Sequence, residues 1–350
     1  MTNHEQVVSL ADVNPSAPAP IRSAVNRALV LLGKGLGGLV VFPRLKVVFP
    51  VIACLVLSSS GVALGQSAWS VRSPTPPQRA LYSVAWTGKQ LVAVGWEGTI
   101  LTSPDGKSWT ARSPGVTQHL RSVIWTGKQL VAVGHQGTIL VSHDGISWTA
   151  SSSATSEDLF SAIWTGTQLV AVGSKGAIRT SPDGIKWSPR YVVTDEYLSS
   201  VTWTGTQLVT VCGESTWGAV FTSPDGISWT NHSSGIMNHR LSSVIWAGKQ
   251  LVAVGGDNAL GNAVVTSPDG SHWTSRSTGM PGWLSSVTWT GKQLVAVGRS
   301  GTIVTSPDGV TWTSRNSGTP FSLRSVIWTG KQLVAVGEAT GARAVILTSP

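Results

Sequence analysis

Short runs of apolar and β-branched residues alternate with glycine-containing turns along most of this chain. Within residues 81–112 there are four such runs, at 81–86, 90–94, 99–102 and 108–112. Runs of this length and composition, bounded by glycine turns, predict β-strands joined by hairpins. The second run is apolar on both of its faces, so the sheet must be covered on both sides. We therefore expect four-stranded units that pack face to face.

The decapeptide WTGKQLVAVG occurs four times, and three near-copies complete a series of seven. The copies begin at Trp86, Trp125, Trp164, Trp203, Trp246, Trp289 and Trp328, so their spacings are 39, 39, 39, 43, 43 and 39 residues. A period near 40 residues with four strands per period is typical of β-propeller blades. The sequence therefore predicts an all-β, seven-bladed propeller with four-stranded blades.

The last copy ends at Leu347-Thr-Ser-Pro350, without a fourth strand of its own. A match to the missing piece lies at the other end of the repeats, where Ala68-Trp69-Ser-Val-Arg72 resembles Ser108-Trp109-Thr-Ala-Arg112. We expect this N-terminal segment to supply the outer strand of the last blade, which closes the ring and leaves no open blade edge. The propeller is predicted to span residues 67–350.

Tryptophan is unusually abundant, with 17 residues, and most of them follow the repeat. Seven are the residues that open the decapeptide copies. Seven more recur near the blade ends, at Trp69, Trp109, Trp148, Trp187, Trp229, Trp273 and Trp312. Repeated aromatic residues of this kind are interpreted as core packing. Trp96, Trp217 and Trp283 lie outside the pattern and are candidates for an exposed, surface role.

The formal net charge is +9, and much of it comes from single lysines in a repeated turn, such as Lys89 and Lys128. Charges spread in this way are typical of a solvated rim. The chain has no run of lysine or arginine and no basic-aromatic cluster. We therefore predict no nucleic-acid partner.

Cysteine and histidine are too sparse to predict a metal centre. Cys54 lies in the N-terminal apolar segment and Cys212 in the fourth repeat, so we expect no internal disulfide. His119 and His135 share a blade junction and could approach each other, but two histidines without a third ligand are weak evidence for a metal. We predict no metal and no cofactor.

The first 66 residues lack the repeat. Residues 1–43 are interpreted as an extension that is disordered or that precedes the true start of the protein. In residues 44–66, Arg44 and Lys46 precede an apolar run at 47–65, which resembles a secretory signal or an uncleaved membrane anchor. A lipoprotein signal ending at Cys54 is a third alternative. All three predict export to the periplasm or the extracellular space, with a membrane contact only through this segment.

A Ser-Pro-Asp-Gly turn, or a close variant of it, follows the third run in the first six units. It places single carboxylates at Asp105, Asp183, Asp225, Asp269 and Asp308, with Asp144 in a His-Asp-Gly variant. Proline and glycine suit the turn geometry, and the carboxylate can accept hydrogen bonds from nearby backbone N–H groups. Because each Asp stands alone in its turn, a structural role is expected and not calcium binding or catalysis.

The S-P-D-G-x-x-W box at Ser103 to Trp109 and its copies resembles the Asp box, or bacterial neuraminidase repeat, although it is one residue shorter than the usual form. Propellers that carry this box include sialidases, sortilin-type receptors and photosystem II assembly factors. The resemblance covers about 280 residues. It implies the propeller fold and leaves the function open.

The repeats differ mainly in the second turn of each unit and in the connections between units, which should open on one face of the ring. The first and third turns, on the other face, are nearly uniform. Variation confined to one face indicates recognition, with unconstrained loop drift as the alternative. The candidate binding residues on this face are Trp96, Glu97, His135, Lys175, Trp217, Trp283, Arg299 and Arg343.

Three functions are consistent with these patterns. The first is a non-enzymatic protein-binding or assembly scaffold that uses exposed Trp and Arg residues as an interface. The second is a multivalent glycan-binding lectin, which would require repeated sites. The third is a sialidase-like glycoside hydrolase, for which Arg121, Arg240 and Arg324 lie at the starts of first strands and could approach the axis. No pair of carboxylates supports hydrolysis, so we assign no catalytic residue and expect a protein partner, with a glycan as the alternative.

Overall fold

The computed structural model describes residues 69–72, 78–192, 194–213, 218–235, 240–257, 261–279 and 282–349. Residues Gln66–Pro350 form one compact unit. The interpretations of residues 1–43 and 44–66 lie outside the described residues and stay predictions. No helix with the length and apolar character needed to span a membrane occurs in the described part of the chain.

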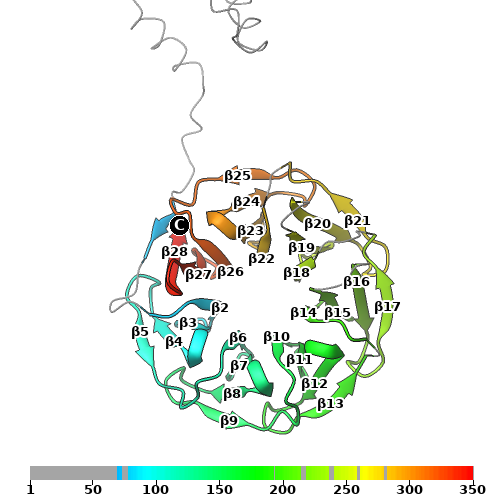
Figure 1. Ribbon diagram of the computed structural model, residues 1–350. Coiled ribbons are helices and arrows are strands. Elements are labelled where there is room, and N and C mark those ends of the chain that lie inside the picture. Colours follow the sequence, from blue (N-terminus) through cyan, green and yellow to red (C-terminus); the bar gives the residue numbers. More distant parts are fainter. Residues whose placement is uncertain are drawn as a thin grey trace, which may run out of the picture. The chain divides into compact units, whose positions relative to one another are not determined.

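The unit is a seven-bladed propeller of four-stranded antiparallel sheets arranged around a central axis (Figure 1). Blade 1 contains β2 (Leu81–Trp86), β3 (Leu91–Gly95), β4 (Ile100–Ser103) and β5 (Thr110–Arg112). Blade 2 contains β6 (Leu120–Trp125), β7 (Leu130–Gly134), β8 (Ile139–Ser142) and β9 (Thr149–Ser151). Blade 3 contains β10 (Leu159–Trp164), β11 (Leu169–Gly173), β12 (Ala177–Ser181) and β13 (Ser188–Tyr191). Blade 4 contains β14 (Leu198–Trp203), β15 (Leu208–Cys212), β16 (Ala219–Ser223) and β17 (Thr230–Ser233).

The remaining blades follow the same order. Blade 5 contains β18 (Arg240–Trp246), β19 (Leu251–Asp257), β20 (Gly261–Ser267) and β21 (Thr274–Arg276). Blade 6 contains β22 (Leu284–Trp289), β23 (Leu294–Gly298), β24 (Ile303–Ser306) and β25 (Thr313–Arg315). Blade 7 contains β26 (Ser322–Trp328), β27 (Leu333–Ala339) and β28 (Arg343–Ser349). The second turns of blades 1, 2, 3 and 6 form short 3-10 helices, η2 (Trp96–Gly98), η3 (His135–Gly137), η4 (Ser174–Gly176) and η5 (Arg299–Gly301).

The ring closes through the N-terminal strand, as the sequence predicts. The strand β1 (Ser70–Val71) pairs antiparallel with β28, so that Ser70 lies opposite Thr348 and Val71 opposite Leu347. The backbone N–H of Arg72 adds a hydrogen bond of 2.6 Å to the carbonyl of Ile346. Segments at opposite ends of the propeller sequence, such as Ser70 and Thr348, thus form one sheet, which removes the unpaired edge of β28.

The hydrophobic core lies between adjacent blades, because the second strand of each blade is apolar on both faces. Between blades 1 and 2, for example, Val92 and Val94 pack against Leu120 and Leu130, and all four are fully buried. A similar cluster joins blade 7 to blade 1. Each buried Val or Leu contributes about 1.5–3 kcal/mol, so every interface between blades is stabilised separately.

The repeated tryptophans pack at the margins of these clusters. Trp109, Trp187 and Trp312 are buried, at 9%, 7% and 9% exposure. Others, including Trp86 and Trp246, are partly buried against the same clusters. The interpretation of the repeated Trp residues as packing groups therefore agrees with their positions.

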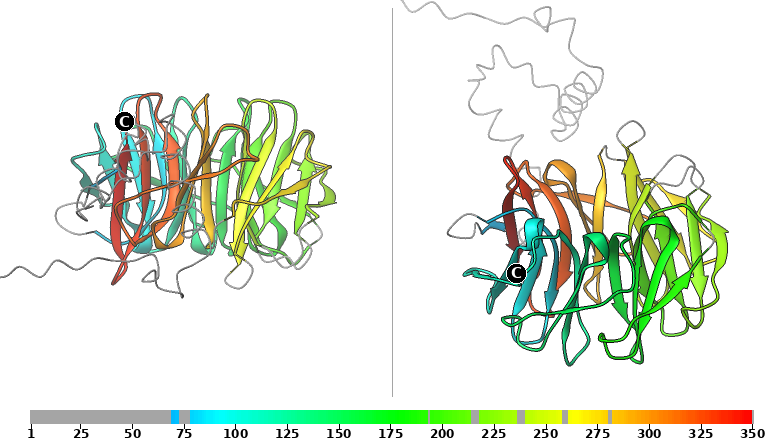
Figure 2. Two further views of the ribbon diagram at one scale, coloured as in Figure 1. Left: turned by 90° about the horizontal axis from the view of Figure 1, so that it is seen from above. Right: turned by 60° about the horizontal axis from the view of Figure 1, so that its bottom comes forward.

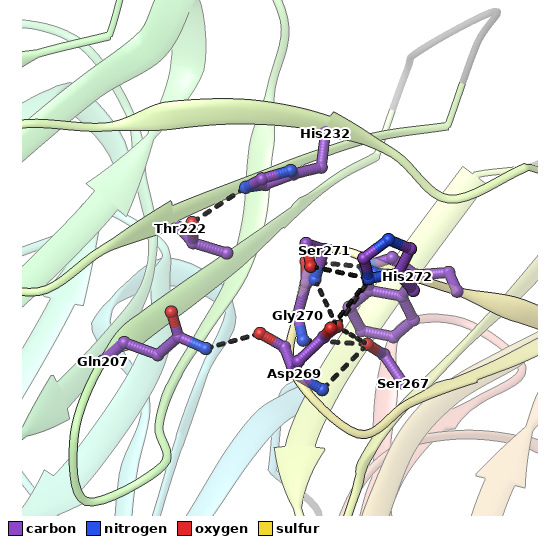
Figure 3. A network of polar contacts seen from close by, with 9 residues as sticks. Gln207, Thr222, His232, Ser267, Asp269, Gly270, Ser271 and His272 are labelled. Carbon is purple, nitrogen blue, oxygen red and sulfur yellow. Dashed lines mark hydrogen bonds and ion pairs between the residues drawn. The ribbon is translucent and has the colours of Figure 1, made fainter.

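Each Ser-Pro-Asp-Gly turn is held by its own side chains, as Figure 3 shows for blade 5. The carboxylate of Asp269 accepts backbone N–H groups from Ser271 and His272, both at 2.9 Å. Ser267 Oγ accepts the N–H of Gly270 at 2.8 Å, and Trp273 Nε1 donates to the Gly270 carbonyl at 2.9 Å. These N–H donors, with His272 beside it, hold the pKa of Asp269 well below its ordinary value. The carboxylate is thus occupied within its own turn.

The first turn of one blade holds the Asp turn of the next. In Figure 3, Gln207 of blade 4 donates from Nε2 to the backbone carbonyl of Asp269 in blade 5, at 2.6 Å. Equivalent bonds join Gln90 to Asp144, Gln129 to Asp183, Gln168 to Asp225, Gln250 to Asp308 and Gln332 to Asp105. The uniform residues of this face therefore tie neighbouring blades together.

The second turns and the blade connections meet at the opposite end of the ring, which we call the loop face. In blade 1 the N–H of Trp96 donates to the carbonyl of Ala80, which precedes β2. The side views show the strands running between the two end faces (Figure 2). The first and third turns thus lie together at one end of the ring, and the loop face lies at the other end. The order of the hairpins predicts this arrangement.

Candidate functional site

Every blade has a β-bulge in its first strand, and this bulge positions the site. In blade 1, Leu81 lies opposite Gly95 and Ser83 opposite Val94, so Tyr82 has no partner in the register. The same register shift occurs in the six other first strands. A bulge redirects the side chain of its extra residue. The bulge residues are Tyr82, Arg121, Phe160, Ser199, Ser242, Ser285 and Arg324.

The residue after the bulge is an invariant serine, and its role is structural. Ser83 Oγ accepts the backbone N–H of Val123 in the next blade at 3.1 Å. Ser161 accepts the N–H of Val201 in the same way, at 3.2 Å. The serine is therefore required for the contact between blades, whereas the bulge residue is free to vary from blade to blade.

The seven bulge residues all line one cavity of about 480 Å³ at the centre of the loop face. Residues from the surrounding loops and strand starts complete its wall, namely Tyr197, Gly213, Arg240, Leu241, Trp283 and Arg299. The cavity is asymmetric, because blades 4 to 6 contribute only serines at the bulge and blades 7 and 1 to 3 contribute large side chains. Its described lining contains four arginines and no Asp or Glu. Such a cavity favours an anionic ligand.

Arg121 is held at the cavity wall by two contacts. Its Nε donates to His135 Nε2 at 2.8 Å, and its guanidinium carbon lies 4.5 Å from the centre of the Tyr82 ring. Burial is the main cause that lowers the pKa of Arg121 and raises the pKa of Tyr82. No residue in the described part of the chain accepts a hydrogen bond from the two terminal nitrogens of Arg121. These nitrogens present the fork that binds a carboxylate in bidentate fashion.

Trp283 forms the wall over blades 5 and 6. Its indole Nε1 donates to Ser242 Oγ at 2.7 Å, and the guanidinium carbons of Arg299 and Arg240 lie 4.6 Å and 6.0 Å from its ring. Trp96, over blade 1, stacks on His119 at a ring distance of 4.5 Å. Both tryptophans are therefore partly buried and fixed by neighbouring blades, rather than fully exposed. Trp217 lies outside the described residues.

Arg324 lies between the central cavity and a second cavity of about 500 Å³ over blades 6 and 7. Its terminal nitrogen donates to Glu338 at 3.0 Å, while its buried Nε has no hydrogen-bond partner among the residues that the structure describes. Arg299 borders both cavities as well. The three arginines expected near the axis, Arg121, Arg240 and Arg324, thus share one cavity, and Arg299 joins them from the loop set.

The other candidates on the loop face form ion pairs at the rim. Glu97 pairs with Arg79 at 3.2 Å, and Lys175 pairs with Glu157 at 3.1 Å. Both pairs join a second turn to the blade connection that precedes the same blade. Each pair is exposed to solvent and therefore contributes little to stability. Arg343 is exposed at the start of β28. Glu97, Lys175 and Arg343 are not among the residues that line the central cavity.

The two histidines of the blade junction approach each other, with ring centres 4.8 Å apart. His119 Nδ1 accepts the backbone N–H of Glu97 at 2.9 Å. Within the described residues, no group of three or more His, Cys, Asp or Glu side chains is arranged to hold a metal ion. The pair instead connects the rim to Arg121 through His135.

Sequence reasoning missed Tyr82, Phe160 and the three bulge serines. The signal was present, because the first strands read LYSVAW, LRSVIW, LFSAIW, LSSVTW, LSSVIW, LSSVTW and LRSVIW. The position after the leucine changes in size and charge while the serine that follows is constant. Without the bulge, strict alternation gives no reason to aim that position at the axis.

No family model and no curated protein matches this chain. Solved structures do match. The structure described as "YCF48 bound to D1 peptide" has a TM-score of 0.66 at 17% identity and covers 83% of this chain and 99% of that chain. YCF48 from Cyanidioschyzon merolae has a TM-score of 0.64 at 18% identity, covering 81% and 98%. The RRP9 WD40 repeats have a TM-score of 0.65 at 13% identity, covering 81% and 99%. At these identities the similarity shows the propeller fold alone.

Proposed function

We propose that this protein is a non-enzymatic, exported propeller that acts as a protein-binding or assembly scaffold through its loop face. In this proposal the central cavity holds a protein segment that presents a carboxylate, either an acidic side chain or a free carboxyl terminus. The main observation in support of this proposal is the set of four arginines in a cavity whose described lining has no carboxylate. Guanidinium groups bind carboxylates with two parallel hydrogen bonds, which gives both affinity and orientation.

The shape of the cavity supports a segment of chain over a small ion. Its volume of about 480 Å³ is in the range that accommodates several amino-acid side chains. Trp283 supplies a flat apolar wall, and the serines of blades 4 to 6 leave room beside it. A structural neighbour is described as bound to a peptide, so a propeller of this fold is compatible with such a ligand.

The glycoside hydrolase alternative gains less support from the same cavity. Hydrolysis of the sialidase type would need an acid and a nucleophile that both reach the substrate, and the described lining has tyrosines but no Asp or Glu. Glu338, outside this lining, is paired with Arg324. Burial raises the pKa of Tyr82, which disfavours its phenolate form. The lectin alternative predicts several equivalent sites, whereas the seven bulge residues form one asymmetric cavity at the axis, with serines in blades 4 to 6 and large side chains in the others. We therefore retain the protein-binding proposal, with one site per chain.

Export remains part of the proposal and rests on residues 44–66, where a basic flank precedes the apolar run. A single cysteine, Cys212, lies in the propeller, and it is buried. Expression of the full chain with a C-terminal reporter, followed by cell fractionation, tests this point. Recovery of the reporter in the cytosolic fraction would reject export, but it would not contradict the proposal that the loop face binds a protein.

Peptide arrays test the binding proposal. The purified full chain is applied to matched arrays of peptides that differ only in a free or an amidated carboxyl terminus, each with and without acidic residues. We expect binding to peptides with a carboxylate, and at least a tenfold loss of affinity in the double variant Arg121→Gln/Arg324→Gln. Lys292→Gln/Lys331→Gln, on the opposite face, is the matched control for removing two charges. Equal binding by both variants, or no carboxylate preference, would reject the site.

A further inference from the structure

The contacts of His119 and His135 have a consequence for protonation. His135 Nε2 accepts a hydrogen bond from Arg121 Nε at 2.8 Å, and His119 Nδ1 accepts one from the N–H of Glu97 at 2.9 Å. An imidazole nitrogen that accepts a hydrogen bond carries no proton. Both rings must therefore be neutral for these contacts to exist, with the proton of His135 on Nδ1 and that of His119 on Nε2.

The carboxylate of Asp158 lies close enough to His135 to attract the imidazole when it is protonated. Asp158, in the connection before β10, has one oxygen 4.0 Å from His135 Nε2. Its other oxygen accepts the N–H of Gln136 at 2.8 Å, so the side chain is fixed beside the imidazole. If Nε2 gains a proton, the guanidinium of Arg121, whose Nε is 2.8 Å away, repels it, and the carboxylate of Asp158, 4.0 Å away, attracts it. The repulsion disfavours the contact with Arg121, and the attraction favours a closer contact with Asp158.

We infer that His135 is a positioning residue for Arg121, and that protonation of His135 releases Arg121 from the wall of the central cavity. This inference rests on the proposed function for its biological meaning, because Arg121 is one of the four arginines assigned to the ligand carboxylate. When His135 is neutral, its Nε2 fixes Nε of Arg121, and the two terminal nitrogens face the ligand. When His135 is charged, Arg121 loses that acceptor and the fork is no longer held in place.

The charged neighbours define where this change occurs. His135 is faced by Arg121, Asp158 and His119, and Arg121 in turn by Tyr82, Arg324, Asp158 and Glu338. Burial lowers the pKa of His135 most, Arg121 and His119 lower it further, and Asp158 opposes them. The pKa of His135 is therefore below its ordinary value of 6.5, and the release of Arg121 is expected on acidification below about pH 6.5.

The direction of the effect on binding distinguishes positioning from simple electrostatics. An added positive charge near the cavity, acting alone, would strengthen the binding of an anion as the pH falls. Loss of the fixed Arg121 fork has the opposite effect, because the ligand must then order this side chain itself. We expect the second effect to be larger, since Arg121 lines the cavity whereas His135 lies outside its lining and is partly exposed to solvent, which screens the new charge. Binding of a carboxylate peptide should therefore weaken on acidification.

Nuclear magnetic resonance of the full chain tests the positioning without any ligand. The Nε–H signal of Arg121 and the ring C–H signals of His135 are followed between about pH 8 and pH 5. We expect both to change with one midpoint, and the Arg121 Nε–H to exchange faster with solvent below it. In Asp158→Asn, which keeps an acceptor for Gln136, both midpoints should move together to lower pH. An Arg121 signal that stays constant while His135 titrates would overturn the inference.

A second variant tests whether the protonation of His135 changes the affinity for a peptide. His135→Gln places a non-titrating acceptor oxygen near the position of Nε2, so Arg121 stays positioned at every pH. With a carboxylate peptide from the arrays, wild-type affinity should fall roughly fivefold or more from about pH 7.5 to pH 5.5, while the affinity of His135→Gln stays level. Stronger wild-type binding at the lower pH would overturn the inference. If no peptide binds but Arg121 and His135 titrate together, the proposed function fails and the positioning role stands.

Discussion

Replacing Gly134 by alanine should damage both the fold and the site, because this glycine lies directly against the histidine pair. Gly134 has an extended backbone, with φ of −165°, so alanine causes no torsional strain there. A Cβ at this position would lie 2.0 Å from the carbonyl oxygen of His119. That oxygen accepts the N–H of His135 at 2.9 Å. The substitution must therefore push the blade connection away from β7.

The cost follows from the geometry. A carbon–oxygen contact needs at least about 3 Å, so the connection must move by about 1 Å, and the hydrogen bond to His135 is lost. An unpaired, partly buried backbone group costs about 1–3 kcal/mol, and the crowding about 1–3 kcal/mol more. Alanine also restricts the unfolded chain, which offsets about 0.5–1 kcal/mol. We expect a net loss of about 1–5 kcal/mol, and a melting temperature about 2–20 °C lower for a protein of this size.

Gly115→Ala is the matched control. Gly115 has a φ of +76°, and a Cβ there meets nothing within 4 Å, so alanine causes torsional strain without a clash. Its expected cost is about 1–2 kcal/mol. Thermal unfolding followed by circular dichroism measures both variants, and peptide binding should be weakened in Gly134→Ala only. A Gly134→Ala protein as stable as Gly115→Ala would refute the steric argument. Blade 4 already has Cys212 at the equivalent position, opposite Leu198 and packed in the core.

Three further substitutions extend the account. Ser285→Phe should fill the serine side of the cavity and abolish peptide binding, with an unchanged melting temperature showing that the fold is intact. Glu338→Gln should raise the affinity for a carboxylate peptide about two- to fivefold by isothermal calorimetry, because Glu338 no longer competes for Arg324. Asp225→Ala should lower stability more than Asp225→Asn in urea unfolding. Because backbone N–H groups hold the pKa of Asp225 below 3.8, its contribution is present above that pH and is lost as the pH falls through the lowered value. The Asn variant should lack this part of the acid loss.

The fold could be predicted because its causes are local and repeated. Glycine turns, a period near 40 residues and a second strand that is apolar on both faces leave few architectures other than stacked blades. The closure by β1 was also predictable, since Trp69 and Arg72 match Trp109 and Arg112 in the first blade. These features depend on residues within one unit or on a comparison between units.

The site was harder to predict from the sequence than the fold, because it depends on contacts between units. The bulge that turns Tyr82 toward the axis is a shift in register, and a strand pattern with period two does not contain it. Trp283 was expected to be exposed, yet Ser242 of the preceding blade and Arg299 of the next turn enclose it. The approach of His119 to His135 was anticipated from their shared junction, but the bond to Arg121 was not. The three arginines expected near the axis, Arg121, Arg240 and Arg324, line one cavity, but the shape of that cavity could not be derived from the sequence.

Photo-crosslinking from the cavity shows directly whether the loop face binds a protein partner. A photoreactive benzoylphenylalanine is introduced at position 197, where it replaces the aromatic ring of Tyr197 in the cavity wall, or at position 292, on the opposite face, in the full chain expressed in the source cells. We expect position 197 to crosslink to an acidic or carboxyl-terminal segment of a protein partner, identified by mass spectrometry, and position 292 not to do so. Crosslinks to that partner from position 292 alone would contradict the claim that the loop face is the binding surface.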